Sequence, residues 1–185
     1  QLQTEKERGI LQVADVDKDQ KLDFIRIRPI SSVVDLFLGY NNNSFQAHQQ
    51  HYYQLDQHDI VRKLLVADLN NDDHLDLIFR YFWRQQLEIS YGFGNGSFHQ
   101  PTPLPTAELS RSSNTLFGDL NNDTYSDIII FLSVEQQIII HLGKSDGRFL
   151  ASPDNVMDAT VGTSNPSLAD FNDDGVLDLV YGGAQ

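Results

Sequence analysis

The stretch Asp15-Val-Asp17-Lys-Asp19-Gln-Lys-Leu-Asp23 recurs three more times along the chain in the same design. The other copies are Asp68-Leu-Asn70-Asn-Asp72-Asp-His-Leu-Asp76, Asp119-Leu-Asn121-Asn-Asp123-Thr-Tyr-Ser-Asp127 and Asp170-Phe-Asn172-Asp-Asp174-Gly-Val-Leu-Asp178. Their first residues lie 53, 51 and 51 positions apart. A period of about 50 residues is typical of stacked supersecondary units that bury their apolar faces against one another. The sequence therefore predicts a repeat architecture.

Each acidic loop places side-chain oxygens at its positions 1, 3, 5 and 9, and the backbone carbonyl at position 7 adds one more. Counting two oxygens from the Asp at position 9, a loop offers about six to seven hard oxygen ligands, which suits calcium better than zinc, copper or magnesium. We therefore expect up to four Ca²⁺ ions, one per loop. The predicted ligands are Asp15, Asp17, Asp19, Lys21 and Asp23; Asp68, Asn70, Asp72, His74 and Asp76; Asp119, Asn121, Asp123, Tyr125 and Asp127; and Asp170, Asn172, Asp174, Val176 and Asp178, where Lys21, His74, Tyr125 and Val176 supply only the carbonyl.

Two other interpretations of these loops compete with calcium binding of this kind. The calcium-binding helix–loop–helix hand needs an acid at position 12, but Arg26, Phe79, Ile130 and Tyr181 stand there. Asp and Asn also form ordinary turns without any metal. A turn needs only one or two such residues, so four oxygen-bearing positions in the same register in four loops favour calcium.

A second signature recurs in phase with the first. The segments Gly39–Phe45, Gly92–Phe98 and Gly143–Phe149 each run from Gly to Phe over six steps, and strand-like apolar stretches precede them. One repeat then holds four short strands, which is typical of a β-propeller blade. The fold class is therefore predicted as all-β, with blades of four antiparallel strands and about 3.6 repeats. The repeats are expected at approximately 1–53, 54–105, 106–157 and 158–185, the last one truncated, in a fragment of a larger propeller of about seven blades.

With these two motifs, nearly the whole chain resembles the FG-GAP/VCBS repeats of integrin α-subunit propellers and related microbial surface proteins. The resemblance implies calcium binding through positions matching Asp15, Asp17, Asp19 and Asp23 and their counterparts. It also implies Gly at position 6, where a left-handed backbone is expected. Only the fourth loop has it, at Gly175, while Gln20, Asp73 and Thr124 depart from the pattern.

The composition narrows the function classes. The net charge is −13, from 26 acids and 13 bases, which argues against nucleic acid as a partner because such binding needs a basic face. Cysteine is absent, which excludes disulfides, thiol catalysis and cysteine-based zinc sites. No apolar run is long enough for a membrane span. Calcium sites of modest affinity fill only where calcium is abundant, so we expect an extracellular or cell-surface location.

No nucleophile elbow, phosphate loop or dinucleotide fingerprint occurs, so we expect no enzyme activity. The favoured hypothesis is a non-catalytic module for adhesion or protein–protein interaction, whose partner is a protein ligand or a glycan at the cell surface, alongside the remaining blades of a larger chain. One alternative is a carbohydrate-binding, lectin-like propeller that uses aromatic residues such as those of Tyr81-Phe-Trp83. The other is an accessory propeller of a secreted or surface enzyme.

Overall fold

The computed structural model describes residues 9–28, 33–40, 44–52, 60–81, 86–104, 114–158 and 164–182, and these residues form an all-β fold. Within these ranges there are fourteen strands and no helix. No helix among them is therefore long and apolar enough to cross a membrane.

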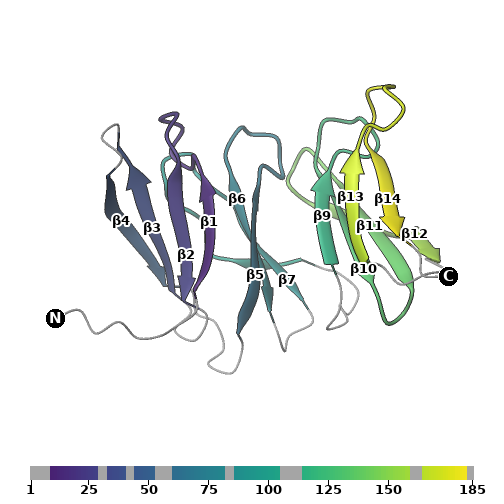
Figure 1. The fold of residues 1–185 in the computed structure, drawn as a ribbon, viewed down its shortest axis with the longest axis horizontal. Helices are drawn as coiled ribbons and strands as arrows, with labels where there is room; N and C mark the ends of the chain where they lie inside the picture. The colour runs from purple at the N-terminus through teal and green to yellow at the C-terminus, as the bar shows by residue number, and fades with distance from the viewer. Residues whose placement is uncertain are drawn as a thin grey trace. The chain divides into compact units, whose positions relative to one another are not determined.

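The strands form four antiparallel sheets in chain order, with each strand paired to its neighbour in sequence (Figure 1). The first sheet holds β1 (Ile10–Ala14), β2 (Asp23–Arg28), β3 (Val33–Gly39) and β4 (Phe45–Tyr52). The second holds β5 (Val61–Ala67), β6 (Asp76–Tyr81), β7 (Leu87–Ser90) and β8 (Thr102–Pro103). The third holds β9 (Asn114–Gly118), β10 (Asp127–Leu132), β11 (Gln137–Gly143) and β12 (Phe149–Asp158), and the fourth holds β13 (Ser164–Ala169) and β14 (Asp178–Gly182).

The strand pattern follows from the sequence. Strands β6 and β10 are buried at every position, which is typical of strands covered on both faces, and β10 is apolar after its first residue, Asp127. Strand β1 instead alternates between exposed and partly buried residues, as in a strand with one solvated face. The predicted four-stranded antiparallel sheets are confirmed for the first three sheets, and the described part of the fourth has two strands. Closure into a propeller, its number of blades and the repeat boundaries stay predictions.

The chain divides into two compact units, each with its own apolar cluster. The first unit comprises residues 1–67 and 73–103, and the second comprises 68–72 and 104–185. In the first unit, one face of the first sheet packs against the second sheet through Val16, Ile25, Ile27, Val34, Leu36, Val61, Leu64, Leu77, Phe79, Tyr81 and Phe98. In the second unit, Ile129, Phe131 and Ile138 of the third sheet pack with Leu168 and Leu179 of the fourth.

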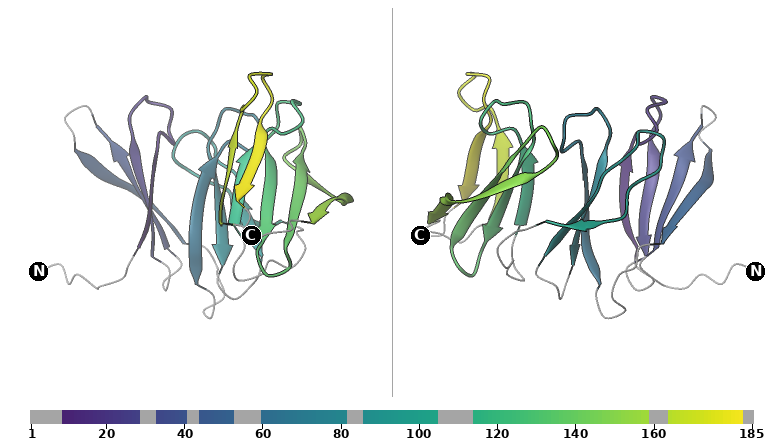
Figure 2. Two further views of the ribbon diagram at one scale, coloured as in Figure 1. Left: turned by 45° about the vertical axis from the view of Figure 1, so that its right-hand side comes forward. Right: turned by 180° about the vertical axis from the view of Figure 1, so that it is seen from behind.

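Within each four-stranded sheet, the acidic loop and the Gly–Phe turn lie at the same end. The acidic loop joins the first and second strands of the sheet, and the Gly–Phe turn joins the third and fourth. Because the strands are antiparallel, both connections lie at the same end of the sheet (Figures 1 and 2). The two motifs that recur in phase along the sequence are therefore neighbours in space.

Candidate metal centre

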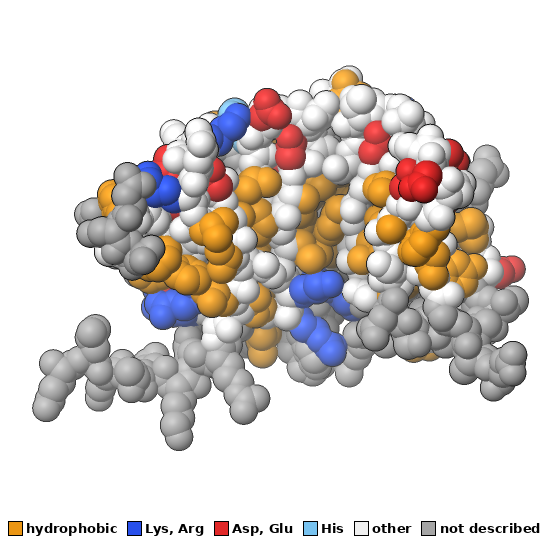
Figure 3. All heavy atoms as spheres, turned by 45° about the horizontal axis from the view of Figure 1, so that its top comes forward, with side chains coloured by type: hydrophobic (Ala, Val, Ile, Leu, Met, Phe, Trp, Pro, Cys, Tyr) orange, Lys and Arg blue, Asp and Glu red, His pale blue; other side chains and the backbone are white. Residues whose placement is uncertain are grey.

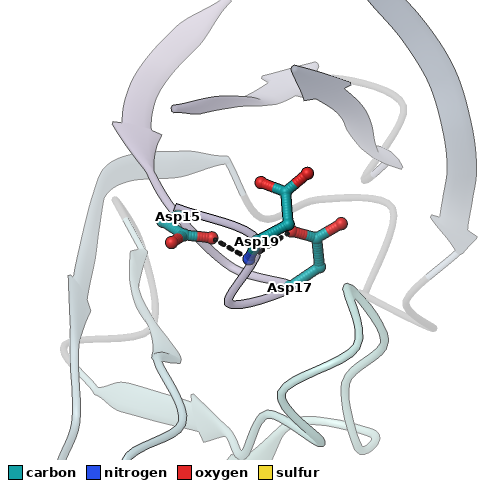
Figure 4. Close-up of side chains that lie close together, drawn as sticks. All are labelled: Asp15, Asp17 and Asp19. Atoms are coloured by element: carbon teal, nitrogen blue, oxygen red, sulfur yellow. Dashed lines mark hydrogen bonds between the residues drawn. The ribbon is translucent and has the colours of Figure 1, made fainter. Parts of the chain in front are cut away.

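The first acidic loop, between β1 and β2, is closed by its own carboxylates. The Asp15 side chain accepts hydrogen bonds from two backbone N–H groups, those of Asp19 at 3.1 Å and Gln20 at 2.8 Å. The Asp19 N–H also reaches Asp17 Oδ1 at 3.3 Å. One carboxylate oxygen from each of Asp15, Asp17 and Asp19 lies within 4.8 Å of the other two (Figure 4). These three predicted ligands are thus brought together as hard oxygens, the donor set that calcium takes.

The third and fourth loops contain the same hydrogen bonds at the same positions as the first loop. Asp119 accepts the N–H groups of Asp123 and Thr124, at 3.1 and 2.7 Å. In the fourth loop, Asp170 accepts the N–H groups at the same two positions, at 3.1 and 2.8 Å. In the second loop, Asp72 N–H donates to Asp68 Oδ1 at 3.3 Å. The four loops therefore share the backbone hydrogen bond from position 5 to the Asp at position 1. On the face shown in Figure 3, acidic side chains reach the surface in several groups.

The loop backbone is left-handed at position 6 in every copy, as the resemblance implied. The φ values are 66° at Gln20, 65° at Asp73, 76° at Thr124 and 84° at Gly175. Position 4 is also left-handed, at Lys18, Asn71, Asn122 and Asp173, which the sequence reasoning missed. Three of those four residues are Asn or Asp, the types that best tolerate this region after Gly, so the signal was present. The β-branched Thr124 adopts it at a cost in strain.

The Asp at position 9 has a second role that the sequence reasoning did not find. Asp23 is fully buried, and its two oxygens accept the N–H groups of Val16 at 2.8 Å and Gly39 at 2.9 Å. It lies outside the close group of three carboxylates in its loop. The carboxylate therefore ties the start of the acidic loop to the start of the Gly–Phe turn, and its role as a metal ligand stays a prediction.

The third sheet repeats both bonds of this clamp, and Asp76 and Asp178 each make one of them. Asp127 accepts the N–H groups of Leu120 at 2.8 Å and Gly143 at 2.9 Å, and Asp76 accepts that of Gly92 at 2.9 Å. Asp178 accepts the Phe171 N–H at 2.9 Å. Burial raises the pKa of the Asp127 carboxyl, while its two N–H donors act in the opposite direction. The constant 16-residue step from Asp to Gly was the signal in the sequence that pointed to this contact.

The first loop differs from the others in how position 5 is held. In the other three loops an Asn at position 3 donates its side-chain amide to the Asp at position 5, for example Asn121 to Asp123 at 3.0 Å. The first loop has Asp17 at position 3, which has no such donor. The Lys21 ammonium donates to Asp19 Oδ2 instead. Lys21 was predicted to contribute only its carbonyl, so its side chain adds an internal cation that the sequence reasoning missed.

The contact between the Lys21 ammonium and Asp19 shifts the pKa of both groups. The hydrogen bond from Lys21 lowers the pKa of the Asp19 carboxyl and raises that of Lys21 itself. Partial burial raises the pKa of the Asp17 carboxyl, and the negative charges of Asp23 and Asp19 raise it further. The four aspartates of this loop outnumber its two lysines, Lys18 and Lys21, and a divalent cation relieves such an excess of negative charge.

The structure describes only part of the aromatic stretch that the carbohydrate-binding alternative uses. Tyr81 is buried and donates its hydroxyl to Glu88 Oε2 at 2.6 Å, so it is a packing residue of the first unit and no sugar platform. Trp83 lies outside the described residues. Phe93 is 48% exposed, and its ring lies 4.1 Å from that of His99.

Comparisons with known proteins match both the repeats and the fold. A family model described as an FG-GAP-like repeat matches residues 14–79 and 119–181, which make up more than half of the chain. No curated protein matches the chain by sequence.

Among solved structures, the chain is similar to an Agrocybe aegerita lectin that recognises non-reducing terminal N-acetylglucosamine. The TM-score is 0.68 at 17% identity, over 95% of this chain and 47% of the lectin chain. It is also similar to the Photorhabdus luminescens Tc holotoxin pore, with a TM-score of 0.59 at 19% identity, over 96% of this chain and 8% of that one. The chain thus spans about half the length of the lectin, and at these identities the likeness concerns the fold alone.

Proposed function

This chain belongs to the family of FG-GAP-like repeat proteins, and from that premise we propose that it is a non-catalytic, calcium-binding module of an extracellular or cell-surface protein. In this proposal the sheets are blades of a β-propeller, and their loops present a surface for adhesion or protein–protein interaction. The likeness in fold to proteins about twice as long or longer supports a partial propeller. The number of blades, the location and the ligand are part of the proposal.

The observation that carries the calcium proposal is the gathering of Asp15, Asp17 and Asp19 oxygens in a loop whose hydrogen bonds recur in the other copies. The side chains at positions 1, 3 and 5 and the carbonyl at position 7 would hold the ion. The Asp at position 9 would contribute only the lone pairs that its backbone N–H donors leave free. Bound calcium would supply positive charge that offsets the carboxylates and fixes the hairpin.

Calcium removal is the direct test of this proposal. At about 1 mM calcium and a dissociation constant of ~0.1 mM, each occupied site adds about 1.4 kcal/mol to the free energy of unfolding. Four sites would therefore raise the melting temperature by roughly 10–20 °C, as measured by calorimetry in calcium and in a chelator. Magnesium at the same concentration is the control ion, and isothermal titration gives the stoichiometry. Identical melting curves with and without calcium would contradict the proposal.

The Lys21 ammonium sets the first loop apart, which gives a second prediction. Replacing Lys21 by Gln removes the cation that competes for Asp19, so calcium should bind the first loop about threefold to tenfold more tightly. Lys18→Gln is the matched control, because it removes the same charge from an exposed position in the same loop. Terbium luminescence titrations would measure both variants. An equal gain in the two would mean that net charge alone decides the affinity.

A carbohydrate-binding propeller is the second candidate, and the lectin among the structural neighbours favours it. Phe93 beside His99 is the exposed aromatic pair to test, since sugars stack on such rings. Glycan-array binding that is lost in Phe93→Ala would favour this candidate over protein adhesion. An accessory role beside a secreted or surface enzyme is the remaining alternative.

A further inference from the structure

The connection between β7 and β8 holds the one Asn-Gly pair of the chain, Asn95-Gly96, inside the segment Gly92–Phe98. The Asn95 side chain is exposed to solvent. In such a pair the backbone nitrogen of the glycine can attack the side-chain amide of the asparagine, and glycine has no Cβ atom to obstruct the approach. The pair is therefore a candidate site of covalent self-modification.

Two donors hold the side-chain carbonyl of Asn95. Its Oδ1 accepts the Ser97 N–H at 3.0 Å and the Ser97 hydroxyl at 2.5 Å. The ring that the N–H bond closes contains both Asn95 Cγ and the Gly96 nitrogen, so the turn restrains the attacked carbon and the nucleophile together. Negative charge develops on Oδ1 when the nitrogen adds to Cγ, and donors already aimed at that oxygen stabilise it.

The nitrogen that leaves distinguishes Asn95 from the asparagines at position 3 of the acidic loops. Asn70, Asn121 and Asn172 each donate their side-chain amide to an aspartate of their own loop, and none of them precedes a glycine. Among the described residues, Asn95 Nδ2 donates no hydrogen bond. Its loss as ammonia therefore breaks no contact in the described part of the fold.

The first acidic loop restrains the nucleophile. The buried Gly96 donates its N–H to the carbonyl oxygen of Val16 at 3.3 Å. Val16 lies between Asp15 and Asp17, and its own N–H donates to the Asp23 clamp at 2.8 Å. The Gly96 nitrogen attacks only after it has lost its proton, and a buried, hydrogen-bonded N–H loses that proton less readily than one in water. Loosening of the first loop should therefore speed the reaction.

The third repeat shows that this turn accommodates an aspartate. Asp146 occupies the position of Asn95, 51 residues further along the chain. Its Oδ1 accepts the Arg148 N–H at 3.1 Å, the same bond that Asn95 makes with Ser97. Isoaspartate is different, because it adds one carbon to the main chain and would disturb the bond from Gly96 to the first loop.

We propose that Asn95 is a deamidation site, which its own turn activates and the first acidic loop restrains. Hydroxide removes the Gly96 N–H proton, the nitrogen forms a bond to Asn95 Cγ, and the bond from Cγ to Nδ2 breaks. Ammonia leaves after it takes a proton from water, which regenerates hydroxide. A second water opens the resulting succinimide at either carbonyl, which gives aspartate or isoaspartate and one new negative charge. The proposal goes beyond the function proposed above and does not depend on calcium.

Peptide mapping by mass spectrometry of the folded chain, incubated in mildly alkaline buffer, tests the activation. We expect Asn95 to convert about tenfold faster than any other asparagine. Ser97→Ala removes the hydroxyl donor and should slow the conversion about tenfold, whereas Ser97→Thr keeps the hydroxyl and should retain the rate. In urea, where the turn is absent, the two variants should react alike. Enzymatic methylation of isoaspartate tells the two products apart.

Asp23→Asn tests the restraint, because it removes an acceptor that holds Val16. We expect it to speed the conversion of Asn95 about threefold. Gly143→Ala is the control, since it crowds the third sheet and leaves the Asn95 turn and the first loop untouched. Hydrogen exchange at the Gly96 amide of the unaltered chain gives a second measurement, and it should be slower than at the exposed Asn95.

Three outcomes would overturn the proposal. One is an Asn95 that converts no faster than the other asparagines of the folded chain. Another is a Ser97→Ala variant that reacts as fast as the unaltered protein, which would remove the activating donor. The third is a Gly96 amide that exchanges as fast as that of Asn95, or equal gains in Asp23→Asn and Gly143→Ala, either of which would remove the restraint by the first loop.

Discussion

Replacing Asp127 by alanine should lower the free energy of unfolding by about 3–5 kcal/mol in a chelator, and by at least as much in calcium. The carboxylate is fully buried and accepts the N–H groups of Leu120 and Gly143. Its removal leaves two backbone donors without an acceptor, at about 1–3 kcal/mol each, and opens a small void. Urea denaturation of the variant in both conditions measures the loss.

The control for Asp127 is an acid that makes no buried contact. Asp146→Ala removes the same charge from an exposed turn and should change stability by less than about 0.5 kcal/mol. A loss at Asp127 that appears only with calcium present would show that the carboxylate acts mainly as a ligand, and would contradict its role as a clamp.

Gly92→Ala should destabilise the protein by about 3 kcal/mol, which is the other large effect expected from this fold. A Cβ atom at Gly92 would lie 2.2 Å from the backbone oxygen of Leu75, and backbone cannot rotate away as a side chain can. The shift needed would also lengthen the bond from the Gly92 N–H to Asp76. Gly39 and Gly143 face the same obstacle at 2.4 Å, from Leu22 and Ser126.

Gly175→Ala separates crowding from backbone strain in this prediction. Gly175 has a φ of 84°, and a Cβ there would meet nothing within 4 Å. It should cost only the left-handed backbone penalty of about 1 kcal/mol. Both variants are measured by urea denaturation in a chelator, so that calcium plays no part. Equal losses at the two glycines would contradict the steric explanation for Gly92.

The strands and loops were accessible from sequence because local chemistry decides them. The strand-like apolar stretches, the Gly–Phe segments and the acidic loops each act over fewer than about ten residues. The left-handed backbone at Thr124 followed the same local rule, although threonine disfavours it. The antiparallel order of each sheet follows from such short connections.

Only part of the role of the Asp at position 9 could be predicted from the sequence. Its place in the loop predicted a metal ligand, but its oxygens are bonded to N–H groups 7 residues back and 16 residues ahead. Those donors come together only after three strands have paired. Lys21 is a different case, because its ammonium contacts Asp19 only two residues away in the same loop, where the other loops use an asparagine amide.

By itself, then, the sequence determined a repeating chain of antiparallel β-hairpins with acidic loops, because propensity and turn chemistry need no distant partner. Only the tertiary structure decided which faces of those hairpins are covered. Leu11 and Leu64 are the same residue at the same repeat position, yet one is 55% exposed and the other fully buried. The difference is the sheet packed against Leu64, and burial depends on that neighbour, which no local pattern contains.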